Sequence, residues 1–249
     1  MTQPVAYLNT DSGAQLAYYQ LKGEQPGVVF CCGFMSDMTG AKAAFVENFC
    51  REQGRAFVRF DYRGHGQSSG DLTKINISSW LADTLAVLDH LTNGPQFIIG
   101  SSMGAWIATL VAKARPERIK KLIGIAAAPD FTEDLIWTQL PSEMQKRLLQ
   151  DEVLYFPSEY SNKPYAITRQ FIEDGRNNLI LRTAIPVNCP VHLLHGMQDA
   201  DIPWQISLKL AECIQSADVK LTLIKDGNHR LSREQDLVLL SQALANHCA

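Results

Sequence analysis

Short apolar runs with strand character alternate with longer amphipathic runs along most of this 249-residue chain. An apolar run that is continuous, with no polar residue at every second position, indicates a strand covered on both faces. A chain that alternates such strands with helices is restricted to βαβ units, with a mostly parallel sheet between layers of helices. We expect strands at residues 27–32, 56–62, 95–100, 121–128, 190–196 and 219–225, and helices at 41–54, 77–94, 105–118, 204–217 and 233–247.

Two further strand-like runs, at residues 4–9 and 14–21, flank the turn sequence TDSG and predict a β-hairpin before the parallel strands. With this hairpin the sheet has eight strands. The chain is 46% hydrophobic, and α/β chains of this length commonly form one core. We therefore expect one α/β domain over residues 1–249.

The alternation stops between about residues 130 and 186, where only helical patterns are found. This segment lies between two sheet strands, and it predicts an insertion over the carboxyl edge of the sheet, where open α/β sheets bind ligands. Its aromatic residues can be extra core or the wall of an apolar pocket under a small helical cap. We take Phe131, Trp137 and Phe156 as candidate substrate-binding residues.

The composition argues against several classes of partner. The formal net charge is −3 and 20% of the residues are charged, so no field attracts nucleic acid or an anionic membrane. No run approaches the roughly 18 apolar residues of a membrane span. The N-terminal residues show no signal peptide or mitochondrial presequence, so we expect a cytoplasmic protein. The six cysteines form no CxxC pair, and we expect neither a metal nor a cofactor.

The stretch FIIGSSMGAWIATL at residues 97–110 places two serines between an apolar strand and a helix. Gly100, Ser102 and Gly104 match G-x-S-x-G, a turn that exposes the middle hydroxyl at the top of the sheet. A five-residue pattern is often matched by chance, but here a predicted strand precedes the motif and a predicted helix follows it, which makes the match specific. Ser102 is therefore the candidate nucleophile, and Ser101 occupies a variable position.

A serine nucleophile needs a base, and His229 is the best placed of the six histidines. It follows the last predicted strand in a short polar loop, KDGNHRLS, at the carboxyl edge. His192 lies within a strand run, His195 ends that run, and His65 lies in the loop sequence RGHG. We interpret His192 as a core residue and His65 as part of a turn.

The acid that orients the base is expected after the preceding strand, in HGMQDADIPW. Asp199 is our candidate, since it would accept from one ring nitrogen of His229 and stabilise the imidazolium. Asp201 is the neighbouring alternative, and Asp226 more simply shapes the loop that carries His229. The order Ser102, Asp199, His229 is the one expected for this arrangement on an α/β fold.

Two backbone amides are expected to bind the oxyanion. Met103 follows the serine at the start of a helix, where free N–H groups point outward. Phe34 follows a strand in the sequence CCGFMSDMTG, and Gly33 lets the chain turn toward the substrate. The Phe34 side chain is then free to line the pocket.

Together, the motifs CCGF, RFDYRGHGQSSG, GSSMG, HGMQDADIPW and GNH resemble those of the α/β-hydrolase superfamily over the full length of the chain. Longer runs around GSSMG, HGMQDADIPW and NHR are similar to animal mitochondrial palmitoyl-protein thioesterases that also act as acyl-glucuronide esterases. The resemblance implies a serine hydrolase of esters or acyl thioesters, with a small helical cap and no metal. Cys32 replaces the more common histidine before Gly33, which leaves the backbone donor unaffected.

We therefore predict a serine esterase or thioesterase that forms an acyl-enzyme on Ser102. Its substrate is a small acyl ester or thioester, or an S-acylated protein. Because one fold carries many functions, two alternatives stay open. One is a hydrolase of C–C bonds with the same fold, and the other is a ligand-binding protein without catalysis.

Overall fold

The computed structural model describes residues 4–157 and 164–245. Its centre is an eight-stranded sheet with the order β1-β2-β4-β3-β5-β6-β9-β10. The pairs β1–β2 and β2–β4 are antiparallel and the others are parallel, which confirms the predicted sheet and its N-terminal hairpin. The strands are β1 (Ala6–Asn9), β2 (Gln15–Leu21), β3 (Glu24–Cys31), β4 (Arg55–Phe60), β5 (Gln96–Ser101), β6 (Ile119–Ile125), β9 (Val191–Gly196) and β10 (Val219–Ile224).

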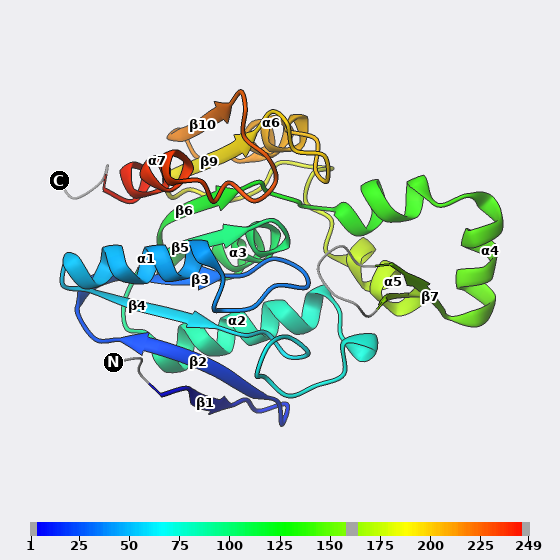
Figure 1. Cartoon of the computed structure of the whole chain (residues 1–249), viewed down its shortest axis with the longest axis horizontal. Coiled ribbons are helices and arrows are strands. Elements are labelled where there is room, and N and C mark those ends of the chain that lie inside the picture. Colours follow the sequence, from blue (N-terminus) through cyan, green and yellow to red (C-terminus); the bar gives the residue numbers. More distant parts are fainter. Residues whose placement is uncertain (1–3, 158–163, 246–249) are drawn as a thin grey trace.

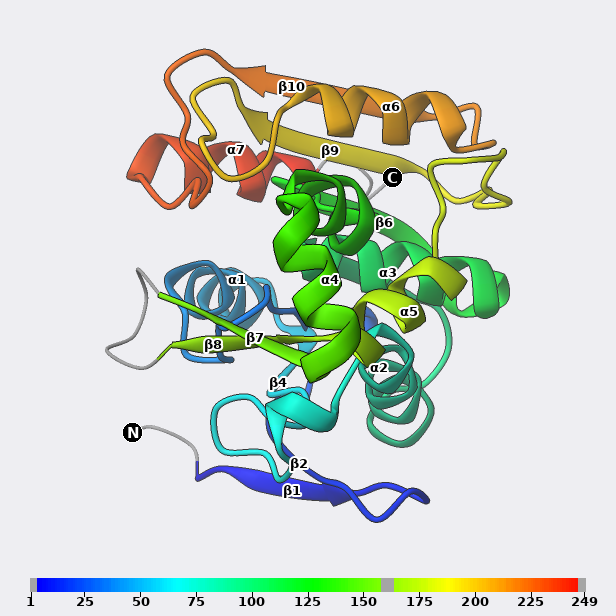
Figure 2. The same ribbon diagram turned by 90° about the vertical axis from the view of Figure 1, so that its right-hand side faces the viewer.

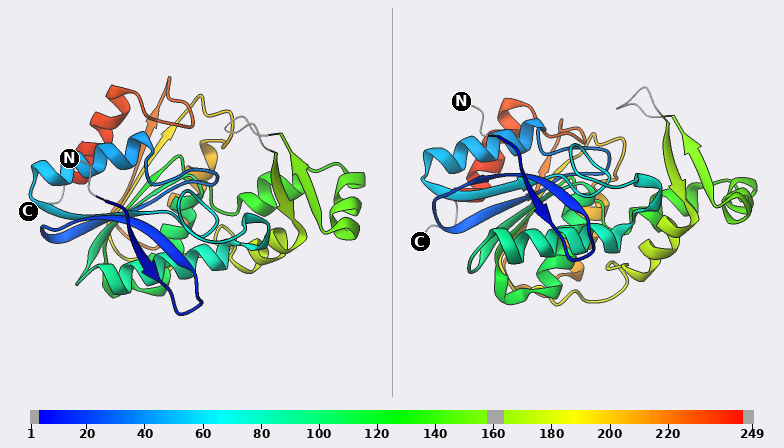
Figure 3. Two further views of the ribbon diagram at one scale, coloured as in Figure 1. Left: turned by 60° about the horizontal axis from the view of Figure 1, so that its bottom comes forward. Right: turned by 90° about the horizontal axis from the view of Figure 1, so that it is seen from below.

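Helices cover both faces of this sheet. On one face α1 and α7 lie side by side, and on the other α2 packs against α3 (Figures 1 and 3). Helix α3 is buried from Met103 to Ala112, as expected of a helix that is apolar all round. The α-helices are α1 (Ala41–Glu52), α2 (Ile77–Leu91), α3 (Met103–Ala114), α4 (Ser142–Asp151), α5 (Arg169–Asn177), α6 (Gln205–Cys213) and α7 (Glu234–Ala245).

The segment between β6 and β9 leaves the sheet and projects from the side toward which the parallel strands point (Figures 1 and 2). It contains a π-helical turn, α4, two strands and α5. The prediction that it is entirely helical is wrong, because β7 (Val153–Phe156) pairs with β8 (Tyr165–Thr168) as an antiparallel hairpin. Each strand has four residues with one fully buried side chain, too short a run to show the period of a strand.

The two ends of this inserted segment are joined by a buried carboxylate. Asp130, just after β6, accepts hydrogen bonds from the amides of Ile180 and Leu181 at 2.8 and 2.9 Å. Its side chain is fully buried and its φ is +59°, in the left-handed region. Asp130 therefore holds the chain where it leaves the sheet against the chain where it returns.

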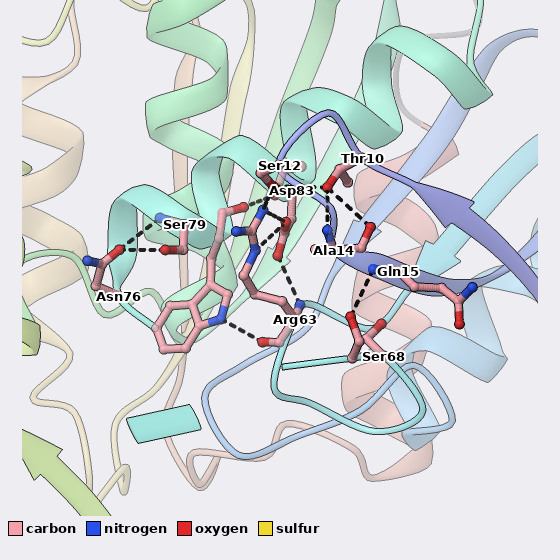
Figure 4. A network of polar contacts seen from close by, with 12 residues as sticks. Thr10, Ser12, Ala14, Gln15, Arg63, Ser68, Asn76, Ser79 and Asp83 are labelled. Atoms are coloured by element: carbon pink, nitrogen blue, oxygen red, sulfur yellow. Dashed lines mark hydrogen bonds and ion pairs between the residues drawn. The ribbon is translucent and has the colours of Figure 1, made fainter. Parts of the chain in front are cut away.

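The loop after β4 is fastened to α2 and to the N-terminal hairpin (Figure 4). Asp83, fully buried on α2, accepts from the backbone amide of Arg63 at 2.9 Å and from Arg63 Nε at 2.8 Å. Arg63 Nη2 also donates to Ser12 Oγ, and Trp80 Nε1 donates to the Arg63 carbonyl oxygen. These bonds fix the loop that carries His65 against the carboxyl edge of the sheet.

Candidate active site

The carboxyl ends of four neighbouring strands are in register. Ser101 of β5 pairs with Ile125 of β6, Ile125 pairs with Leu194 of β9, and Gly196 of β9 pairs with Ile224 of β10. The loops that follow β5, β9 and β10 therefore begin at one edge. This register brings together the side chains of Ser102, Asp199 and His229, of which the first and the last are 127 residues apart in sequence.

Ser102 occupies a sharp turn between β5 and α3, with φ +55° and ψ −121°. Non-glycine residues rarely adopt this conformation, which costs about 1–3 kcal/mol and persists only where the surroundings enforce it. The surroundings do so here, since the Ser102 amide donates to the Ile125 carbonyl and the Ser102 carbonyl accepts from the amides of Ala105 and Ala128.

Both glycines of the motif are required by close backbone contacts. A Cβ on Gly100 would lie 2.2 Å from the Gly104 carbonyl oxygen, and one on Gly104 would lie 2.2 Å from the Cys31 carbonyl oxygen. The first contact joins β5 to α3 and the second joins α3 to β3. The two glycines are therefore needed for the packing of α3 against β5 and β3 as well as for the turn.

Ser102, His229 and Asp199 form one hydrogen-bonded chain. Ser102 Oγ lies 3.1 Å from His229 Nε2, and His229 Nδ1 lies 2.7 Å from Asp199 Oδ2. The Asp199 side chain is fully buried, whereas the His229 side chain is 19% exposed. In the neutral ring Nδ1 carries the hydrogen, which leaves Nε2 free to accept the serine proton.

Asp199 is surrounded by donors. Its Oδ1 accepts from the amides of Asp201 and Ile202 at 2.9 and 2.8 Å, and its Oδ2 accepts from His229 and from His195. Burial works to raise the pKa of Asp199, but the bonds from His195, His229 and Ile202 outweigh it and hold the pKa below the usual range. Asp199 is therefore a carboxylate at any pH at which the protein works.

The loops that carry Asp199 and His229 are pressed together at two glycines. A Cβ on Gly196 would lie 2.2 Å from the carbonyl oxygen of Gly227. The Gln198 amide donates to that same oxygen at 2.9 Å, and the Met197 amide donates to the Ile224 carbonyl. This contact aligns the acid with the base.

The loop after β3 lies against the serine, since a Cβ on Gly33 would be 3.3 Å from Ser102 Cβ. Among the hydrogen bonds of the described residues, none uses the amides of Phe34 or Met103, the two expected oxyanion donors. The next residue, Met35, has φ +57°, and its amide donates to His65 Nε2 at 3.2 Å. His65 thus holds the strained turn beside the Phe34 amide.

We expect His65 to make the protein less stable in acid. Burial lowers the pKa of His65 from 6.5 to about 4, so between these values the unfolded chain binds a proton that the folded chain does not. Stability therefore falls as the pH drops from 6.5 toward 4, and the His65 contribution to this loss is about 3 kcal/mol.

Denaturant unfolding at pH 7 and pH 4.5 checks this prediction. His65→Gln should lose less stability than the wild type between the two pH values. His90→Gln, at an exposed position on α2, is the matched control and should follow the wild type. Equal losses in the wild type and His65→Gln would contradict it.

Phe34 stands at the centre of an aromatic cluster. Its ring centroid lies 5.8–6.3 Å from five other rings, which belong to the sheet domain and to the inserted segment. The ring of Phe171 on α5 is stacked on it at 5.8 Å. The other four rings are those of His65, Trp80, Phe131 and Tyr165.

The three aromatic residues predicted to bind substrate lie in different places. Phe131 contacts Phe34 directly, with ring centroids 6.1 Å apart. Phe156 on β7 reaches the cluster through Tyr165, on which it stacks at 5.8 Å. Trp137 instead lies under the guanidinium of Arg176, 4.7 Å from its ring centroid. Phe131 thus belongs to the cluster around Phe34, Phe156 stacks on its outer member Tyr165, and Trp137 faces a cation.

Asp199, Asp201 and His229 also offer three possible metal-ligand atoms within 4.8 Å of one another. Both oxygens of Asp199 and both ring nitrogens of His229 already take part in the hydrogen bonds described above. A cation there would have to break the hydrogen bonds that link Asp199 through His229 to Ser102. Asp226, which the sequence analysis assigned to shaping the loop that carries His229, is in an ion pair with Arg233.

Two histidines that the sequence analysis set aside belong to the site. His65 contacts the loop that carries Phe34, and His195 contacts the acid. The motifs RGHG and HGMQD contain both residues, yet a motif does not state which atoms its side chains reach. Phe171 and Tyr165 were missed for the same reason, because their contacts with Phe34 are tertiary.

Residues 24–170 match the family described as serine aminopeptidase S33. The chain is 43% identical over 237 residues to the mitochondrial palmitoyl-protein thioesterase ABHD10 of mouse, covering 95% of this chain and 80% of the relative. This relative is mitochondrial, so the expectation of a cytoplasmic protein is wrong.

Two solved structures are similar throughout. The mouse α/β-hydrolase domain-containing protein 10 has a TM-score of 0.90 at 40% identity, with 98% of each chain covered. A putative hydrolase from Agrobacterium vitis has a TM-score of 0.92 at 37% identity, covering 98% of this chain and 99% of that one. Within the described residues, no helix combines the length and apolar character needed to cross a membrane.

Proposed function

Because the chain belongs to the serine aminopeptidase S33 family of α/β-hydrolases and is an ester or thioester hydrolase, we propose that it forms an acyl-enzyme on Ser102. One observation carries this proposal. The Ser102 hydroxyl, the His229 ring and the buried Asp199 carboxylate are joined by hydrogen bonds of 3.1 and 2.7 Å at one edge of the sheet. A serine in this setting has the base and the oriented acid that nucleophilic catalysis needs.

In the proposed reaction, Ser102 Oγ attacks the acyl carbonyl carbon while its proton passes to His229 Nε2. Asp199 stabilises the resulting imidazolium, and the amides of Phe34 and Met103 bind the oxyanion. The tetrahedral intermediate expels the alcohol or thiol, which takes the proton from His229. Water then gives a proton to His229 and attacks the acyl-serine, and the carboxylic acid leaves as Ser102 regains its proton.

For the substrate we propose an acyl group with a long alkyl chain or an aryl ring. The aromatic cluster around Phe34 supports this, since it places apolar surface beside the amide that would bind the oxyanion. The inserted segment, at about residues 130–186, would act as the cap, with Phe131 and Phe156 in contact with the acyl group. The named activity of the mouse relative supports an S-acylated protein as one substrate.

Direct detection of the acyl-enzyme tests this proposal. The protein would be mixed with p-nitrophenyl esters and acyl thioesters of graded chain length, quenched in acid and measured by mass spectrometry. We expect an adduct of the acyl mass on the peptide that contains Ser102, and a kcat/KM that rises with chain length. Turnover without an adduct on that peptide would contradict the proposal, and binding without turnover would favour a ligand-binding protein.

A further inference from the structure

His195 ends strand β9, and the reaction described above gives it no role, although its side chain is fully buried. Its Nε2 lies 3.1 Å from Asp199 Oδ2 and 3.1 Å from the carbonyl oxygen of Ile202. Its Nδ1 lies 2.6 Å from Ser207 Oγ, which is also buried, on α6. Every ring nitrogen of this histidine thus has a buried partner.

These partners determine where the ring hydrogen is. A carboxylate oxygen and a carbonyl oxygen can only accept, so Nε2 must be the nitrogen that donates. In the neutral ring Nδ1 then accepts from the Ser207 hydroxyl. The hydroxyl of Ser207 and the Ile202 carbonyl therefore hold the ring in the tautomer that points an N–H at Asp199.

Two imidazole rings consequently share one oxygen of the acid. Asp199 Oδ2 accepts from His229 Nδ1 on one side and from His195 Nε2 on the other. Its other oxygen is taken by two backbone amides. Ser207, His195, Asp199, His229 and Ser102 form one continuous chain, with a Ser–His pair on each side of the carboxylate.

We propose that His195 is a positioning residue for the hydrolytic reaction: its Nε2–H fixes the rotation of the Asp199 carboxylate and weakens the hold of Oδ2 on the proton of His229. The inference rests on the proposed roles of Asp199 and His229. A second donor on Oδ2 withdraws charge from the oxygen that faces the base, so His229 gives up its proton more readily.

The other polar groups beside this chain of hydrogen bonds are the same in the wild type and in the His195 variants. His229 approaches from the loop after β10, and Ser207 approaches from α6. The Asp201 carboxylate lies within 4.8 Å of the Asp199 and His229 side chains, and its amide donates to Asp199 Oδ1. None of these groups is removed when His195 is replaced.

The pH profile of kcat/KM distinguishes positioning from mere packing. His195→Phe keeps a flat ring and removes the donor. We expect its kcat to fall about tenfold with KM within about twofold, and its acid limb to move up by about half to one pH unit. His195→Gln retains an N–H donor and should return the acid limb to the wild-type position. An unmoved acid limb in His195→Phe would overturn the proposal.

Two control variants show whether a shift of the acid limb in His195→Phe comes from the lost contact with Asp199. His192→Phe removes an imidazole from the same strand, where it contacts Thr222 and not Asp199, and its acid limb should stay in place. Ser102→Ala tests the proposed function itself: if it keeps full activity, the proposed function fails, whereas an inactive Ser102→Ala with an unmoved acid limb in His195→Phe rejects the role of His195 alone.

A measurement on the wild type covers the case in which His195→Phe does not fold. The ¹⁵N shifts of the His195 ring, in protein labelled at histidine, report which nitrogen carries the hydrogen. We expect the hydrogen of the neutral ring to be on Nε2, the nitrogen that faces Asp199 and the Ile202 carbonyl. A ring with its hydrogen on Nδ1 would have nothing to donate to Asp199 and would overturn the proposal.

Discussion

Ser102→Ala is expected to lower kcat/KM for every ester or thioester substrate by about 10⁴-fold or more, with no change in the melting temperature beyond a few degrees. Alanine retains the Cβ that already occupies the strained turn at φ +55°, so the backbone sees no new atom. What is lost is the only oxygen within hydrogen-bond distance of His229 Nε2 among the described residues. The remaining activity would come from the oxyanion amides and from binding.

The adjacent serine provides a matched control. Ser101 is nearly buried in β5, and Ser101→Ala should keep most of the activity and still react with a fluorophosphonate probe. His229→Ala should lose about as much activity as Ser102→Ala, and the double variant should lose little more, because the two residues act as one unit. If the loss of activity in the double variant were the product of the two single losses, Ser102 and His229 would act independently.

Gly104→Ala is the second prediction with a large effect, and it concerns stability. The new Cβ would lie 2.2 Å from the Cys31 carbonyl oxygen and 2.4 Å from that of Cys32. Both obstacles are backbone atoms, one of the last residue of β3 and one of the residue after it, so no side-chain rotation can relieve the contact. We expect the free energy of unfolding to fall by about 3 kcal/mol or more, and the melting temperature by about 6–12 °C.

Activity should fall as well in any Gly104→Ala protein that folds, since α3 would have to move away from β3 and carry the Ser102 turn with it. Gly40→Ala is the control. There the new Cβ would be no closer than 3.5 Å to any atom, and its φ of −56° suits alanine. Denaturant unfolding of both variants checks the difference, and equal stabilities would contradict the packing role of Gly104.

The main elements of the fold could be predicted because local patterns of apolar residues indicate them. The continuous apolar runs around residues 97–100 and 191–196 became β5 and β9, and the periodic runs between them became helices. The hairpin β7–β8 could not be predicted in this way. Its strands have four residues each, and they pack against α4 and α5, contacts that no local sequence pattern encodes.

At the active site, the sequence and the tertiary structure determine different things. The spacing of Ser102, Asp199 and His229 relative to the ends of predicted strands is a property of the sequence, because parallel strands end at one edge whatever fills the core. The sequence therefore determined which residues meet. The partners of these residues depend on side-chain directions and on distances of a few tenths of an ångström, which no local pattern encodes.

His65 and His195 show this difference. Both lie in motifs that are visible in the sequence, which suggests only a turn for His65 and the end of a strand for His195. The tertiary structure decided that His65 accepts from the Met35 amide and that His195 donates to Asp199. The first bond joins the loops after β3 and β4, and the second joins the end of β9 to the loop that follows it. A chain in isolation specifies the residues that can form hydrogen bonds, and only the packed molecule decides which of their atoms face one another.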